Sequence, residues 1–219
     1  MGEDSQFAKY SIVEVDVQRH RGDRRPESLR PNLETLKVID RIGTADGWHE
    51  RFSHVRPLVA PSLCAIKRDQ AARGTSLGIF RPAEFTGFRF EPAEPWSASK
   101  AAIANQLDLI DQDLRQLEWV PLEFRYSFRC ADEQCSGHDM GLRDWEAGES
   151  YRKFLGRYGK QAVQDKLRER WFDRMITPEK AVHCFVGNVA SRPKTFMLLG
   201  LHYPHRGVVE NVQESLFDT

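Results

Sequence analysis

The sequence predicts an α+β fold, with a mostly antiparallel sheet on which three to four helices pack. Strand-like alternation and helix-like periodicity both occur along the chain, which is typical of this class. Hydrophobic residues make up 40% of the 219 residues and aromatic residues 11%, enough for a packed core and too many for a disordered chain.

The first half of the chain is expected to be rich in strands. Valine at every second position from Val13 to Val17 indicates a half-buried strand, and the polar run after it indicates a loop. Trp48, Phe52 and Val55 share one side of a short helix. In order, the predicted elements are a strand at 10–18, a loop at 19–32, a strand at 33–42 whose spacing also allows a helix, a helix at 46–55, and strands at 75–82 and 84–92.

The second half holds the clearest patterns. An apolar stripe from Ile103 to Leu117, behind a capping serine, predicts a regular helix. Apolar and polar residues alternate strictly from Leu122 to Cys130, which a helix would not tolerate. In order, the predicted elements are a helix at 97–120, a strand at 121–130, helices at 142–159 and 161–175 separated at Gly159, and strands at 181–188 and 194–204 joined by a loop of hairpin length.

The chain is expected to form one compact unit made of two parts. Residues 1–95 are predicted to form a β-rich N-terminal region with a basic loop, and residues 96–219 an α+β region with a Cys/His loop. The proline-containing run at 91–99 suggests the boundary, although no long linker occurs there.

Composition predicts a cytoplasmic protein without a membrane segment. No run approaches the roughly 18 consecutive apolar residues of a membrane helix, and the first residues lack the features of a secretory signal. Four cysteines are few for a secreted disulfide framework of this length, so a reducing compartment is expected. The 32 basic and 32 acidic residues balance, so any attraction to a polyanion must come from local clusters.

Residues 128–146 contain the pattern with the most specific chemistry. Cys130 ends a predicted strand, and Cys135 and His138 follow with the spacing Cys-x4-Cys-x2-His. Zinc prefers four thiolate or imidazole ligands in a tetrahedron, and short Cys/His loops supply two or three of them. The sequence therefore predicts a zinc site between a strand and a helix, formed by Cys130, Cys135 and His138 with Cys184 as the fourth ligand.

Other ligands and other interpretations stay open. His183 stands beside Cys184 on the same predicted strand, and Asp139 and His205 are weaker candidates. Without a metal, the two strand cysteines would be small core residues, and the loop cysteine and histidine would be ordinary loop residues. A redox role for Cys135 is a third interpretation.

Acidic residues after the histidine raise a catalytic alternative. Two or three carboxylates can bind magnesium in a nuclease-like site. The plainer interpretation is that they stabilise the N-terminus of a helix, where the helix dipole favours negative charge. The sequence contains no phosphate-binding glycine loop, nucleophile elbow or dinucleotide fingerprint. The carboxylates concerned are Asp139, Asp144, Glu146 and Glu149.

Two basic clusters predict contact with DNA or RNA. One is the predicted loop at 19–32, and the other lies on the helices after the Cys/His loop, where aromatic residues are interleaved. Arginine beside aromatic side chains binds phosphate and stacks on bases, although a charged helix face is often only solvated. The predicted contact residues are Arg19, Arg21, Arg24, Arg25, Arg152, Lys153 and Arg157.

Three functions remain candidates. The first is a zinc-stabilised binding protein that contacts nucleic acid or a complex that handles it, which requires the two basic clusters to share a face. The second is a metal-dependent, nuclease-like hydrolase, which requires at least two carboxylates and a histidine or lysine to converge. The third is a protein–protein adaptor whose zinc site is purely structural.

Overall fold

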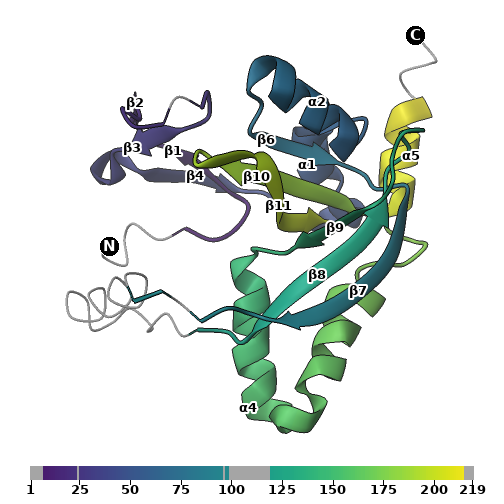
Figure 1. The fold of residues 1–219 in the computed structure, drawn as a ribbon. Coiled ribbons are helices and arrows are strands. Elements are labelled where there is room, and N and C mark those ends of the chain that lie inside the picture. The colour runs from purple at the N-terminus through teal and green to yellow at the C-terminus, as the bar shows by residue number, and fades with distance from the viewer. Residues whose placement is uncertain (1–6, 24, 96, 99–118, 215–219) are drawn as a thin grey trace.

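The α+β class is confirmed by the structure, a computed structural model that describes residues 7–23, 25–95, 97–98 and 119–214. Figure 1 shows two larger sheets in the middle of the molecule, with α2 above them and α4 below them in that view. Among the described residues, no helix combines the length and the apolar character that crossing a membrane requires.

The elements follow one another in a mixed order. The strands are β1 Ser11–Glu14, β2 Val17–Arg19, β3 Leu29–Pro31, β4 Lys37–Arg41, β5 Val59–Ala60, β6 Leu77–Phe80, β7 Glu84–Pro92, β8 Leu122–Arg129, β9 His138–Gly141, β10 His183–Val189 and β11 Arg192–His202. The helices are α1 Ala45–Val55, α2 Leu63–Arg73, α4 Trp145–Arg168 and α5 Arg206–Glu214, with short helical turns η2 Leu33–Thr35, η3 Arg56–Leu58 and η4 Glu169–Asp173.

The longer strands form two sheets that meet at one point. The first has the order β11-β10-β6-β5, and only its short β5–β6 pair is parallel. The second has the order β7-β8-β9 and is antiparallel throughout. Leu142, just after β9, forms a bridge with Leu198 of β11, which joins the two sheets. Two-stranded ribbons, β1–β4 and β2–β3, complete the N-terminal part.

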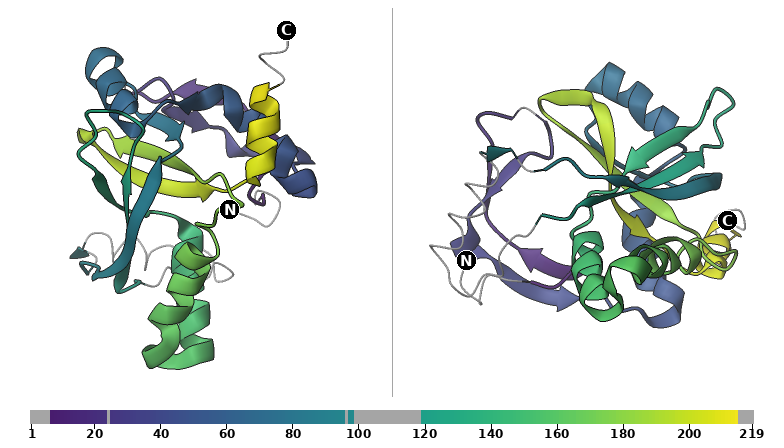
Figure 2. Two further views of the ribbon diagram at one scale, coloured as in Figure 1. Left: turned by 90° about the vertical axis from the view of Figure 1, so that its right-hand side faces the viewer. Right: turned by 60° about the horizontal axis from the view of Figure 1, so that its bottom comes forward.

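The main core lies where the two sheets, α2 and α4 meet. Phe80 of β6 and Phe128 of β8 are fully buried with ring centroids 5.5 Å apart. The Tyr126 hydroxyl donates to the carbonyl of Trp171 at 2.5 Å, so this buried polar group is satisfied. Full burial of a phenylalanine side chain such as Phe80 or Phe128 stabilises the fold by about 1.5–3 kcal/mol. A smaller cluster, around Phe52, joins α1 to α5, which pack side by side in Figures 1 and 2.

The first half of the chain departs from prediction at the basic loop. The strand predicted at 10–18 is present as two strands, β1 and β2. The segment predicted as a loop contains β3, which pairs with β2 in a hairpin. Both strands are exposed, so their polar side chains stay in water. The strands pair through backbone hydrogen bonds, which do not require an apolar face.

The second half matches the predicted strands β8, β10 and β11 and the break between two helical segments. The break is inside α4, where Gly159 has φ 74° and ψ 173°. Residues with a side chain rarely adopt a positive φ, so glycine suits the point where the helix turns back on itself. Figure 1 shows α4 accordingly as two arms that meet at the bottom of the molecule.

Two helices of the structure were not predicted from the sequence, and one predicted helix falls mostly outside the described residues. The helices α2 and α5 are present in segments to which the sequence analysis assigned no element. The predicted helix concerned is the one at 97–120: of its span, residues 99–118 lie outside the described residues.

Candidate metal centre

Three cysteines and one histidine converge at the contact between α2 and the sheet β7-β8-β9. Their ligand atoms, the sulfurs of Cys64, Cys130 and Cys135 and a ring nitrogen of His138, all lie within 4.8 Å of one another. Cys130 and Cys135 are buried, and Cys64 and His138 are half-buried. The group is therefore able to hold a metal ion.

The distances within this Cys3His group suit a tetrahedral ion. The His138 Nε2 atom lies 3.3 Å from the Cys64 sulfur and 3.5 Å from the Cys135 sulfur. Zinc bonds of about 2.3 Å to sulfur and 2.0 Å to nitrogen separate neighbouring sulfur and nitrogen ligands by about 3.5 Å. These two separations are thus those of neighbouring ligands around one ion, and the other pairs of ligand atoms lie within 4.8 Å. None of the three thiols is in a disulfide.

The start of α2 positions Cys64. Ser62 is the N-cap, and its hydroxyl accepts a hydrogen bond from the Ala65 N–H at 2.9 Å. Cys64 follows in the first helical turn, and the backbone N–H groups of Leu63 and Cys64 donate toward the Cys130 sulfur. The free N–H groups at a helix N-terminus favour negative charge, so this end of α2 suits a thiolate ligand.

The loop between β8 and β9 positions the other three ligands. The Cys135 N–H donates to the Asp132 carbonyl at 2.9 Å, and the Cys130 N–H donates to the Cys135 sulfur at 3.2 Å. Gly137, with φ 96°, lets the chain return so that His138 begins β9. The Asp132 carboxylate also pairs with Arg68 of α2 at 2.6 Å, which fastens the loop to the helix.

Without a metal, the local environment acts on the four groups in different directions. Burial and, to a lesser extent, the neighbouring thiols of Cys130 and Cys135 together raise the pKa of the Cys64 thiol to about 12. Burial also raises the pKa of Cys130, against the hydrogen bonds from α2. The backbone hydrogen bond from Cys130 lowers the pKa of Cys135, and burial lowers the pKa of His138. A bound cation would favour the thiolates and the neutral imidazole, the forms that coordinate metals.

The structure brings together three of the four predicted ligands and replaces the fourth. Cys184 lies on β10 opposite Phe80 and Leu201, fully buried, and is not in the Cys3His group. Its apolar strand neighbours make it a core residue. Cys64 stands in its place and was not considered as a ligand in the sequence analysis. The sequence did contain one sign of the helix that carries Cys64: capping residues stand at both of its ends, Ser62 and Gly74.

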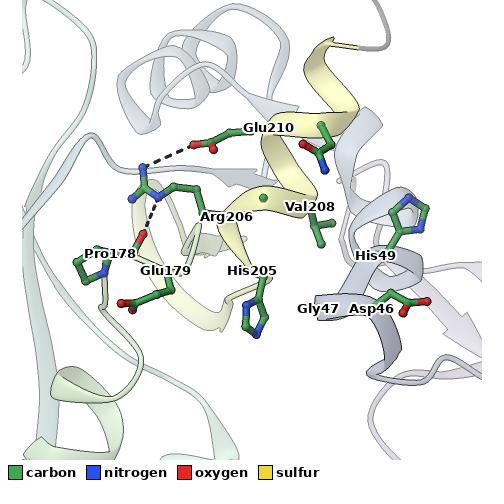
Figure 3. Close-up of a pocket in the computed structure, with 11 residues that line it drawn as sticks. Asp46, Gly47, His49, Pro178, Glu179, His205, Arg206, Val208 and Glu210 are labelled. Carbon is green, nitrogen blue, oxygen red and sulfur yellow. Dashed lines mark hydrogen bonds and ion pairs between the residues drawn. The ribbon is translucent and has the colours of Figure 1, made fainter.

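The alternative histidine ligands also lie elsewhere. His183 is buried against Phe52, 5.4 Å between ring centroids, and His205 lines a hollow between α1 and α5. Figure 3 shows that His205 and His49 of this hollow point in different directions. Among the residues that the structure describes, the Cys3His group is the one set of three or more such donors close enough to hold an ion.

The carboxylates of the hydrolase hypothesis are engaged in other interactions. Asp139 accepts hydrogen bonds from Arg89, Arg125 and Ser127, and the Arg89 guanidinium in particular holds its pKa well below the usual range. Glu149 pairs with Arg152 at 2.9 Å.

Asp144 and Glu146 do converge on a lysine, but as an ion pair. Asp144 is the N-cap of α4, where its carboxylate accepts from the Glu146 N–H at 2.9 Å. The Lys9 ammonium lies 3.6 Å from Asp144 and 3.2 Å from Glu146. Burial works against the charge on Lys9, but the two carboxylates outweigh it and raise its pKa. A lysine held in its charged form offsets one of the two carboxylate charges and occupies oxygens of both acids, which makes them less suited to bind magnesium.

The predicted nucleic-acid contacts are spread over two elements. Arg19 donates to the Pro26 carbonyl at 3.0 Å, and Arg25 pairs with Asp23 and donates to the Asn188 carbonyl at 2.6 Å. These two arginines therefore hold the β2–β3 hairpin together and fasten it to β10. Arg21 is in the exposed turn, and Arg24 lies outside the described residues. The others, Arg152, Lys153 and Arg157, lie on α4.

The fold and the site define an α+β protein with a Cys3His group able to hold a metal. Residues 59–219 match a family model described as "Domain of unknown function (DUF8757)", and residues 1–57 match one described as "Domain of unknown function (DUF8758)". The first match covers well over half of the chain, so the protein belongs to the DUF8757 family, and the whole Cys3His group falls within that match. Comparison with curated proteins and with solved structures found no match.

Proposed function

We propose that this protein is a zinc-stabilised binding protein in which Cys64, Cys130, Cys135 and His138 hold a structural zinc ion. The observation that carries the proposal is the convergence of these four donors within 4.8 Å from two distant segments of the chain. Three cysteines and a histidine form one of the common closed zinc sites. Four protein ligands leave no position for a substrate, so the ion would act on the fold and not on a reaction.

The ion would link α2 to the loop between β8 and β9. One ligand comes from α2 and three from the β8–β9 loop, and Cys64 and His138 are 74 positions apart in the chain. Two polar side-chain links between the segments, Ser62 to Asp132 at 3.4 Å and Arg68 to Asp132, are partly exposed. Exposed ion pairs contribute at most about 1 kcal/mol, so zinc would add a much stronger link to these contacts and to the packing of Leu63 and Ile66 in the core.

The metal content of the purified protein tests this proposal. Elemental analysis of protein prepared without chelator is expected to give about one zinc per chain, because the four donors complete one tetrahedron. Cys64→Ser is expected to lose most of this zinc. The matched control is Cys184→Ala, which changes a cysteine outside the Cys3His group and is expected to keep it. Native protein without zinc, or zinc lost only in Cys184→Ala, would contradict the proposal.

The partner of this binding protein is open between nucleic acid and protein. The β2–β3 hairpin and α4, which carry the two basic clusters, lie on separate parts of the molecule in Figure 1. Among the described residues the clusters therefore do not combine into one basic surface, and two of the hairpin arginines are engaged within the fold. This arrangement supports the adaptor more than the nucleic-acid contact, which stays a prediction.

A salt titration separates the two. If α4 contacts nucleic acid, binding of a short labelled duplex weakens steeply with salt, and replacing Lys153 and Arg157 with alanine flattens the log–log slope by about two, one for each lost phosphate contact. Replacing Arg73, an exposed arginine of α2, leaves the slope unchanged. No binding of duplex or single strand at low salt would reject nucleic acid in favour of a protein partner.

A further inference from the structure

A cavity of about 400 Å³ lies between the N-terminal segment, α1, η4 and β11, away from the cysteines. Its size is at the lower end of the range of small-molecule sites. Its wall is rich in cations and aromatic rings, including Lys9, Tyr10, Arg41, Trp48, Arg51 and Arg170. We call it the cationic pocket.

The charges of the cationic pocket do not balance. Lys9 is paired with Asp144 and Glu146, which also line the pocket. The described residues give no acidic partner to the other three cations, which are Arg41, Arg51 and Arg170. Four cations less two carboxylates leave a net charge of +2 on the wall. Such an excess in a concave site attracts anions.

Arg51 is the most constrained of these arginines. It is only 9% exposed, and its guanidinium donates to a single neutral acceptor, the Ile42 carbonyl, at 3.1 Å and 3.3 Å. The guanidinium lies 3.6 Å from the ring centroid of Tyr10 and 4.9 Å from that of Trp48. A buried charge without a counter-ion is costly, and stacking on two rings fixes its orientation.

The backbone that holds these rings is strained. Tyr10 has φ 68° and Trp48 has φ 73°, and Asp46 and Gly47 before Trp48 are also left-handed. Bulky residues rarely adopt this conformation, and residues that do are concentrated at ligand sites, where the surrounding structure holds them in place. In this protein two such residues, whose ring centroids are 6.0 Å apart, both contact the buried arginine.

Trp171 of η4 also lines the cationic pocket and is 2% exposed. Its indole N–H has no hydrogen-bond partner in the structure, but the nitrogen itself is buried and does not donate into the pocket. Trp171 therefore contributes an apolar ring to the wall.

We infer that the cationic pocket binds a small phosphorylated molecule, with Arg41, Arg51 and Arg170 on its phosphate group. A phosphate monoester carries about two negative charges at neutral pH, which matches the excess of +2 on the wall. The guanidinium fork is the donor geometry that suits phosphate oxygens. A carboxylate would neutralise only half of the excess. The inference is independent of the metal centre, because no residue of the pocket belongs to the Cys3His group.

Calorimetric titration at low salt tests the inference with three probes: inorganic phosphate, phenyl phosphate and benzoate. Saturable binding of both phosphates at one site per chain is expected, with phenyl phosphate at least about tenfold tighter than benzoate because one charge-assisted pair more is formed. Arg170→Gln and Arg41→Gln are each expected to weaken phenyl phosphate binding about tenfold or more. Both arginines are exposed, so these changes leave the core intact.

The matched control is Arg174→Gln. Arg174 lies one turn after Arg170, pairs with Glu169 and does not line the cationic pocket, so the variant has the same charge change next to the site. It is expected to bind phenyl phosphate within about twofold of the native protein, since it removes no contact. Absence of saturable phosphate binding would overturn the inference. Equal weakening in Arg174→Gln, or benzoate as tight as phenyl phosphate, would overturn it too.

Discussion

Removal of the metal is expected to lower the melting temperature of this protein by about 10–20 °C. Structural zinc sites contribute about 10–16 kcal/mol in small peptides, and loss of even a third of this would be about 5 kcal/mol. For a chain of this size each kcal/mol shifts the melting temperature by about 2–4 °C. The measurement is a thermal melt followed by circular dichroism, with and without a chelator, and again after zinc is returned.

Two variants make this result specific to the Cys3His group. Cys64→Ser is expected to melt at the temperature of the chelated native protein and to respond to neither chelator nor zinc. Cys184→Ala removes a fully buried sulfur, so its melting temperature is lower at the start, but it keeps the response to chelator. An unchanged melt in both chelator and Cys64→Ser would show that the four residues do not hold a stabilising ion.

A fall in pH from about 6.5 to about 4 is expected to destabilise the protein through a pair of buried histidines. His183 of β10 pairs with His202 of β11, their ring centroids 6.2 Å apart, and both are almost fully buried. Burial lowers the pKa of each to about 4, and for His202 the neighbouring His183 and Arg51 add to the effect. Both histidines are therefore neutral in the folded protein at neutral pH.

The sign of the pH dependence follows from proton uptake. An unfolded histidine takes up its proton near its ordinary pKa of 6.5, whereas the folded one does so only near 4. Between these values the unfolded state holds more protons, so folding stability is full above about pH 6.5 and falls as the pH falls toward 4. The expected loss is on the order of 2–3 kcal/mol for each histidine.

Urea unfolding of native protein and of His202→Leu at pH 7 and pH 4.5 measures this. Leucine has a similar volume and needs no hydrogen bonds, whereas both ring nitrogens of His202 are buried without a partner. The variant is expected to be at least as stable at pH 7 and to lose about 2 kcal/mol less on acidification. Acid would also release a metal bound to the Cys3His group, but it would do so in both proteins, so this effect cancels in the comparison. His54→Gln, at an exposed position of α1, is the control, and the same acid loss in all three proteins would contradict the prediction.

The sequence predicts those residues of the Cys3His group that lie close together in the chain, and it does not predict the distant one. The turn from Cys130 to His138 puts three ligands in nine residues, and its spacing alone indicates their chemistry. Cys64 joins them through tertiary packing, which spacing does not encode. Cys184, the predicted fourth ligand, lies outside the Cys3His group for a physical reason: its strand is buried on both faces, which places it in the core.

The fold shows the same division between local and non-local information. Strict alternation predicted β8 because one face of that strand is buried, and the break at Gly159 was visible because glycine permits its conformation. The helix α2 was missed because only Leu63 and Ile66 are buried on it, too few to make a helical stripe. The β3 strand of the β2–β3 hairpin was predicted as loop because none of its residues is buried, so no hydrophobic period marks it.

The wall of the cationic pocket is shared between the two family-matched parts of the chain. Three of its four cations, Lys9, Arg41 and Arg51, lie within residues 1–57, whereas Arg170 and the Trp171 indole lie within residues 59–219. The Cys3His group, in contrast, belongs wholly to the second part. A chain that carried only the second part would keep all four residues of the Cys3His group but only one of the four cations that line the pocket. Loss of the first part would thus reverse the sign of the charge on the pocket wall and leave the four donors of the Cys3His group in place.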